Sequence, residues 1–173
     1  MLRSVRRERF SPVRMARLAS LIVATVLVQT IVFPNLRFFG VVPDVGLVVA
    51  VAVAYTEGAE SGALFGFVTG LAVDLFLNTP FGLSALAFAI TAFAVGVFHE
   101  ALVRVPRFLP VLLTFAAGIV GGSIFVLVGA LVGEEHLFEA QSIGTVVTAA
   151  AYDAVLAPGV FPLVRRSLRA ESR

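Results

Sequence analysis

The sequence predicts an all-α polytopic membrane protein, a bundle of six transmembrane helices. Two observations predict this class. Of the 173 residues 59% are hydrophobic and 14% charged, with a mean hydropathy of +1.00, which excludes an ordinary soluble domain. Apolar stretches also recur along the chain, and about 20 such residues cross a hydrocarbon layer roughly 30 Å thick.

Six apolar stretches are separated by short polar or Pro- and Gly-bearing segments. Pro43 and Asp44 suit the start of the second helix, because proline lacks a donor and aspartate favours the positive N-terminal dipole. This second stretch is too short to cross comfortably, so we expect local bilayer thinning or burial against neighbouring helices. The expected spans are residues 15–33, 45–55, 61–77, 81–98, 109–132 and 143–164.

The placement of arginine sets the expected topology. All 13 basic residues are arginines, and six crossings from a cytoplasmic N-terminus leave only Arg37 outside, which satisfies the positive-inside rule. No small-residue cleavage site follows Val32, so we expect an anchored first helix and not a cleaved signal. We therefore expect a cytoplasmic Arg-rich segment 1–14, a transmembrane domain 15–164 and a cytoplasmic Arg-rich tail 165–173, in a bacterial inner membrane.

Small residues recur every four positions along the third span. In lipid, helices associate through close packing, and Gly-x-x-x-Gly steps mark where another backbone can approach. The partner could be a helix of the same chain or that of another protein, and the sequence leaves both open. This glycine ridge comprises Gly58, Gly62, Gly66 and Gly70, with Asp74 at the next position.

Two acidic residues lie within spans. Asp74 is expected near the outer face, where water relieves part of the free-energy cost of placing a carboxylate in the membrane. Asp153 lies near the middle of the sixth span, where a charged aspartate costs roughly 2.5 to 3.5 kcal/mol. We expect it to be a neutral acid that donates a hydrogen bond, with the carbonyl of Ala154, released by Pro158, as a nearby acceptor. A role in binding a proton, ion or substrate is the alternative.

A stripe of small or polar residues also follows the sixth span: Thr145, Ala149, Asp153 and Ala157. We expect this stripe to face the glycine ridge, and Gly118 with Gly122 to form a weaker packing notch. If Asp74 and Asp153 lined one cavity, they would indicate a cation path.

Enzymatic and nucleic-acid functions find no support. The chain contains no Gly-x-Ser-x-Gly elbow, phosphate loop or His-Glu-x-x-His motif, and no cysteine. Its two histidines stand in separate polar stretches, so we expect neither a metal site nor a cofactor. The basic residues flank spans without an aromatic platform, which is typical of lipid contact and not of nucleic-acid binding.

The third and fourth spans resemble a known family. Pro43 and Asp44 precede a helix, residues 62–70 read GALFGFVTG, Asp74-Leu75 follows, and residues 82–86 read GLSAL. The pattern G-x-x-x-G-F-x-x-G-x-x-x-D-L followed by G-L-x-A-L resembles the rod shape-determining MreD family, most strongly over residues 43–98. The resemblance implies helix-packing or partner-binding roles for Phe67 as well as the glycine ridge.

The resemblance implies a non-enzymatic scaffold of the cell-elongation machinery. Its partner would be MreC, which connects to the RodA glycosyltransferase, the elongation penicillin-binding transpeptidase and MreB filaments. The scaffold would help organise peptidoglycan synthesis during elongation. We expect the glycine ridge and the stripe of the sixth span to form a close-packed seam, part of it available to a partner helix.

The family is also distantly similar in fold to the membrane-embedded substrate-binding subunits of energy-coupling-factor vitamin transporters. A transporter subunit is therefore the alternative function. It would need a ligand pocket near the outer face, close to Asp44, Asp74 and Asn78, whereas the outer loops are short.

Overall fold

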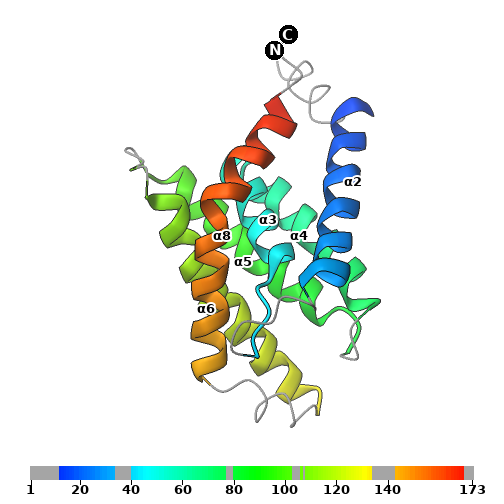
Figure 1. The fold of residues 1–173 in the computed structure, drawn as a ribbon, viewed down its shortest axis with the longest axis vertical. Coiled ribbons are helices and arrows are strands. Elements are labelled where there is room, and N and C mark those ends of the chain that lie inside the picture. The colour runs from blue at the N-terminus through cyan, green and yellow to red at the C-terminus, as the bar shows by residue number, and fades with distance from the viewer. Residues whose placement is uncertain are drawn as a thin grey trace.

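The computed structural model describes residues 12–33, 40–76, 80–102, 106, 108–133 and 143–169. Regular secondary structure in these ranges is helical, which confirms the predicted all-α class. Six α-helices and a five-residue π-helix, η1, form one bundle (Figure 1). In chain order they are α2 (Pro12–Leu27), η1 (Val28–Val32), α3 (Val45–Glu57), α4 (Ala59–Asp74), α5 (Leu83–Glu100), α6 (Leu109–Leu131) and α8 (Ile143–Arg169).

Four helical stretches in the described ranges are long and apolar enough to cross a membrane: Pro12–Val32, Leu83–Glu100, Leu109–Leu131 and Ile143–Leu168. Each coincides with a predicted span to within a few residues at either end. The two remaining helices are shorter, 13 residues in α3 and 16 in α4. At 1.5 Å per residue they are only about 20 and 24 Å long.

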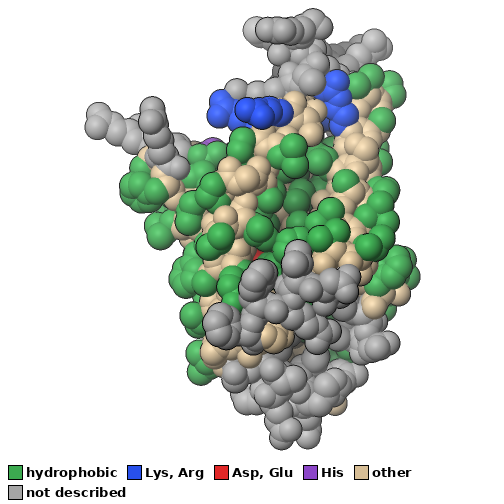
Figure 2. Space-filling model, in the orientation of Figure 1, with side chains coloured by type: hydrophobic (Ala, Val, Ile, Leu, Met, Phe, Trp, Pro, Cys, Tyr) green, Lys and Arg blue, Asp and Glu red, His purple; other side chains and the backbone are tan. Residues whose placement is uncertain are grey.

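Successive helices alternate in direction (Figure 1). Arg14 near the start of α2 contacts Glu57 at the end of α3, and Glu100 at the end of α5 contacts Ala59 at the start of α4. The described arginine side chains, those of Arg14, Arg17, Arg165 and Arg166, gather at this end, which we call the basic end (Figure 2). The opposite end, where α3 and α5 begin, is called the far end.

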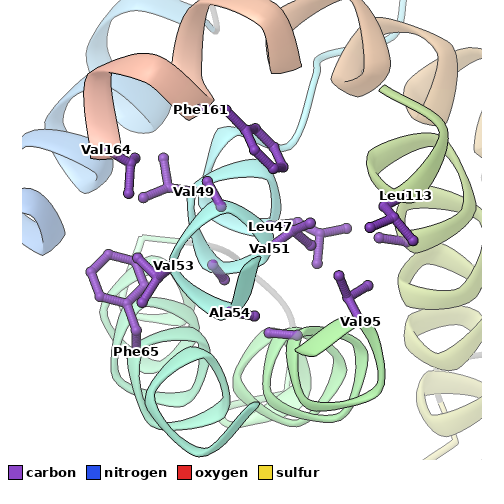
Figure 3. Close-up of a cluster of buried hydrophobic side chains, with 14 of the residues drawn as sticks. Leu47, Val49, Val51, Val53, Ala54, Phe65, Val95, Leu113, Phe161 and Val164 are labelled. Carbon is purple, nitrogen blue, oxygen red and sulfur yellow. The ribbon is translucent and has the colours of Figure 1, made fainter. Parts of the chain in front are cut away.

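Helix α3 forms the centre of the core. Residues 50–54 are fully buried, and α4, α5, α6 and α8 all pack against α3. Figure 3 shows side chains from these neighbours, including Phe65, Val95, Leu113 and Phe161, pointing toward α3. A helix too short to cross the hydrocarbon comfortably is thereby surrounded by protein, which confirms the expected burial against neighbours.

The glycine ridge packs within the chain, against α3 and α5. A Cβ built on Gly62 would overlap Ala54 of α3, and one on Gly70 would overlap Ala85 of α5. On Gly66 it would lie 2.9 Å from the carbonyl oxygen of Phe88. The expectation that this ridge faces the sixth span is wrong, because α3 and α5 already occupy its surface.

Gly58 has a different role from the rest of the ridge. It is the single residue between α3 and α4, and its φ of +92° is one that L side chains rarely adopt. The chain therefore reverses at Gly58, and the two shortest helices form a hairpin that places Ala54 beside Gly62.

Helix α8 packs against α6 and α3. A Cβ on Gly118 would lie 2.7 Å from that of Ala150, and one on Gly122 would lie 2.9 Å from Val146, so α6 and α8 approach closely at these glycines. Helix α8 continues through Pro158, and its upper part leans away from the axis of its lower part (Figure 1). Pro158 itself is exposed.

Candidate functional site

The start of α3 is held by side chains from two other elements and from its own N-cap. Asp44 is the N-cap residue, and its Oδ1 accepts a hydrogen bond from the backbone N–H of Leu47 at 3.2 Å. The backbone N–H of Asp44 donates to Oδ1 of Asp153 on α8 at 2.7 Å. Asp153 is only 1% exposed, so this carboxylate satisfies a helix start from inside the bundle. The structure therefore gives it an acceptor role where donation was expected.

Gln29, in η1, completes the same network and was not singled out in the sequence. Its Oε1 accepts from the N–H of Val45 at 2.7 Å, and its Nε2 donates to the carbonyl of Pro43 at 3.4 Å. In the sequence, the signal for this role is a single amide side chain near the end of the first apolar span. The π-helix containing it is a second signal, but one visible only in the structure.

Asp74, at the end of α4, performs the equivalent task for α5. Its carboxylate oxygens accept hydrogen bonds from the backbone N–H groups of Gly82 at 2.8 Å, Ser84 at 3.2 Å and Ala85 at 3.4 Å. The residue is 3% exposed. The expectation that water solvates the Asp74 carboxylate is therefore wrong, because backbone N–H groups surround it instead.

Glu100 caps a third helix at the basic end. Its Oε1 accepts from the N–H of Ala59, the first residue of α4, at 3.1 Å. His99 is the preceding residue, and the centroid of its ring lies 3.9 Å from that of Tyr55. Arg14 ties α2 to the same region through Glu57 at 2.6 Å and Ser61 at 3.3 Å.

Three carboxylates thus serve three helix starts on other elements. The first N–H groups of a helix have no partner within it, and an unsatisfied backbone group in lipid costs several kcal/mol. Asp153, Asp74 and Glu100 meet that need for α3, α5 and α4. The two acids that stood out in the sequence therefore both have a structural role in joining helices.

A cavity of about 330 Å³ lies beside the start of α3. Asp44 and Asp153 line it, whereas Asp74 does not, so the two sequence-flagged acids do not share one cavity. Asn78 lies outside the described residues. The other lining residues include Gln29, Ser84, Phe88, Phe125, Thr145, Ala149 and the α6 glycines 118, 121 and 122. Within the described ranges, no group of three or more metal-ligating side chains is present.

Comparison with known families decides which family the chain represents. The model of the rod shape-determining protein MreD matches residues 11–170, nearly the whole chain. The chain belongs to the MreD family. The resemblance seen over residues 43–98 is confirmed and extends across all the described helices. At a significant level, the chain matches no curated protein and no solved structure.

Membership of the MreD family makes this a rod shape-determining membrane protein. Its four long apolar helices agree with that class. MreD proteins are shape-determining proteins and not an enzyme family. The carboxylates described above satisfy backbone donors in this bundle.

Proposed function

We propose that the chain is a membrane scaffold of the bacterial cell-elongation complex that binds MreC and helps organise peptidoglycan synthesis, without chemistry of its own. The match to the MreD family over residues 11–170 carries this proposal. RodA, the elongation penicillin-binding transpeptidase and MreB join through the complex, and membrane lipids contact the remaining outward faces. Nucleic acid is not a partner.

The proposed orientation has six crossings, with both termini in the cytoplasm. The alternating helix directions support it (Figure 1), as does the gathering of Arg14, Arg17, Arg165 and Arg166 at one end (Figure 2). Cytoplasmic loops and termini carry the excess of arginine in membrane proteins. The basic end is therefore cytoplasmic, residues 15–164 form the membrane domain, and segments 1–14 and 165–173 lie on the cytoplasmic side of the inner membrane.

The partner helix docks on the outward face of α4 in this proposal. The glycine ridge is occupied by α3 and α5, which leaves the opposite face of α4 for an external helix. Leu64, Phe67 and Val68 share that face at helical spacing and are 67%, 44% and 40% exposed. Helix α4 has only 16 residues, so a longer helix alongside it would shield a short helix from lipid.

Co-purification of MreC from membranes tests the scaffold and its docking face. Phe67→Ala should lower MreC recovery at least threefold while the protein remains at its normal level. Phe115→Ala is the matched control, because Phe115 is also exposed, at 37%, on α6. Equal recovery with both variants would move the docking face elsewhere, whereas wild-type protein that never retains MreC would refute the scaffold itself.

A transporter subunit, similar to the substrate-binding components of energy-coupling-factor vitamin transporters, is the second candidate. The cavity beside Asp44 favours it, because a ligand pocket was expected near that residue. Mass spectrometry of the purified protein tests this candidate. Recovery of a stoichiometric vitamin with an ATPase module would support it, and recovery of MreC without either would favour the scaffold.

A further inference from the structure

The cavity at the far end has the size of a binding site. Its volume of about 330 Å³ falls within the range of small-molecule pockets, which is roughly 300 to 1,000 Å³. Its walls come from η1, α3, α4, α5, α6 and α8 together with residues 40–42 and 44, so it lies between several packed helices. The glycines of α6 keep it open: a Cβ on Gly118 would stand 3.3 Å from Oδ2 of Asp153 and would cover part of that carboxylate.

Asp153 presents an unused acceptor to this cavity. The residue is 1% exposed, and its Oδ1 accepts from the N–H of Asp44. No group in the described part of the chain donates a hydrogen bond to its Oδ2. Asp44 lines the same cavity, and its Oδ1 is used for the N–H of Leu47. Two carboxylates therefore face one space, that of Asp153 buried and that of Asp44 half-buried, and each has one oxygen bonded to a backbone donor.

None of the described residues that line the cavity offsets these two negative charges. The described lining residues include no arginine, lysine or histidine, and the arginine side chains of the described ranges lie at the opposite end of the bundle. A buried carboxylate without a partner is costly, and two facing the same space repel one another. The start of α3 contributes only the partial positive charge of its backbone N–H groups.

The rest of the lining suits a charged group carried on an organic stem. Phe88 and Phe125 supply aromatic faces, which attract cations as well as apolar groups. Gln29, Ser84 and Thr145 supply amide and hydroxyl groups around them. The volume of about 330 Å³ is about ten times that of a single water, which occupies about 30 Å³ in the liquid, so the space is larger than a bare ion needs.

We propose that this cavity binds an organic cation, an ammonium or guanidinium group, which Asp153 and Asp44 hold while its stem lies against Phe88 and Phe125. The cation could belong to a free amine or guanidine, or to a lysine or arginine side chain of a partner protein that reaches the far end. Both sources present the same chemistry to the two carboxylates. The proposal goes beyond the scaffold function and stands independently of where MreC docks.

Thermal unfolding of the full chain in lipid nanodiscs, with butylguanidinium and its uncharged isostere butylurea as probes, tests the chemistry. At ten times its dissociation constant, butylguanidinium should raise the melting temperature of the wild-type protein by about 3 to 5 °C, and butylurea should not. Asp153→Asn and Asp44→Asn each keep an oxygen for the helix-start hydrogen bond, and should bind the guanidinium at least about tenfold more weakly. Glu60→Gln, an acid at the basic end, is the control that should respond as the wild type does.

Equal stabilisation by butylurea, or an undiminished response in both asparagine variants, would overturn the proposal. A photo-cross-linking residue at Val146, which lines the cavity, then distinguishes the two sources in cells. A cross-linked peptide that places a lysine or arginine there would identify a partner side chain, and a retained small amine in native mass spectra would identify a free ligand. If neither is found, no natural cation occupies the site, and the proposal fails on that count.

Discussion

The carboxylate of Asp153 accepts a 2.7 Å hydrogen bond from the backbone N–H of Asp44, a residue 109 positions earlier in the chain. This one contact joins α8 to the start of the central helix α3. It belongs to a repeated arrangement in which an acid on one helix serves the unpaired N–H groups that begin another. The bundle is therefore held together at helix starts as well as by close packing of small residues.

Replacement of Asp153 separates its acceptor role from its charge. Asp153→Asn keeps an oxygen within reach of the Asp44 N–H, so we expect the free energy of unfolding to change by less than about 1 kcal/mol. Asp153→Leu leaves that donor unsatisfied and should lower the free energy of unfolding by about 1 to 3 kcal/mol. Thermal unfolding in nanodiscs measures both, and equal losses for the two variants would contradict the acceptor role.

Asp74 should be more sensitive than Asp153, because its two oxygens accept three backbone N–H groups. Asp74→Ala removes every acceptor and should destabilise the protein by several kcal/mol, since each unsatisfied buried donor costs about 1 to 3 kcal/mol. Asp74→Asn keeps one oxygen and should lose less. Hydrogen exchange at the amides of residues 82–85 reports the effect directly. Unchanged exchange in the alanine variant would show that these bonds contribute little.

The glycine ridge predicts a sharp contrast between two Gly→Ala variants. At Gly62 the added methyl would overlap Ala54, so the helices must separate, and we expect a loss of at least about 1 to 3 kcal/mol. At Gly159 nothing lies within 4 Å of the added methyl, so Gly159→Ala should be neutral or stabilise α8 by up to about 1 kcal/mol. Melting temperatures of the two purified variants test this. A harmless Gly62→Ala would mean that α3 and α4 do not approach this closely.

The Arg14–Glu57 ion pair predicts coupling between α2 and α3. The side chains are 16% and 25% exposed, so the pair is partly shielded from solvent, and a coupling energy of about 1 kcal/mol is expected. A double-mutant cycle with Arg14→Ala and Glu57→Ala measures this energy as the departure of the double variant from additivity. Strictly additive losses would show that the pair contributes no net stability.

The positions of the helices were largely predictable from the sequence, because hydropathy is a local property. Burial of polar groups in lipid is unfavourable wherever they occur. A stretch such as residues 109–132 can therefore be recognised as a span from its own composition, without reference to the rest of the chain. The helix start at Asp44 could be predicted for the same reason, since an N-cap bonds only three residues ahead. The family could be read from the local motif in residues 62–86.

The contacts between helices could not be predicted in the same way. Gly62 and Gly70 indicated that another helix backbone packs closely against α4. They did not indicate that this backbone belongs to α3 and α5 and not to α8. The roles of Gln29 and Glu100 could not be predicted, because an amide or an acid at the end of a span usually contacts water. Which donor each of them meets depends on the relative rotation of helices far apart in the chain.

The sequence by itself determined that this is an all-helical membrane protein of the MreD family, with its arginines near the ends of the apolar spans or between them. The tertiary structure decided that α3 is enclosed, that Asp153 and Asp74 serve helix starts, and that one cavity contains two carboxylates. The physical reason is the distance along the chain over which each interaction acts. Partition into lipid depends on the composition of each segment, whereas a hydrogen bond between Asp153 and Asp44 forms only once all the helices between them have packed.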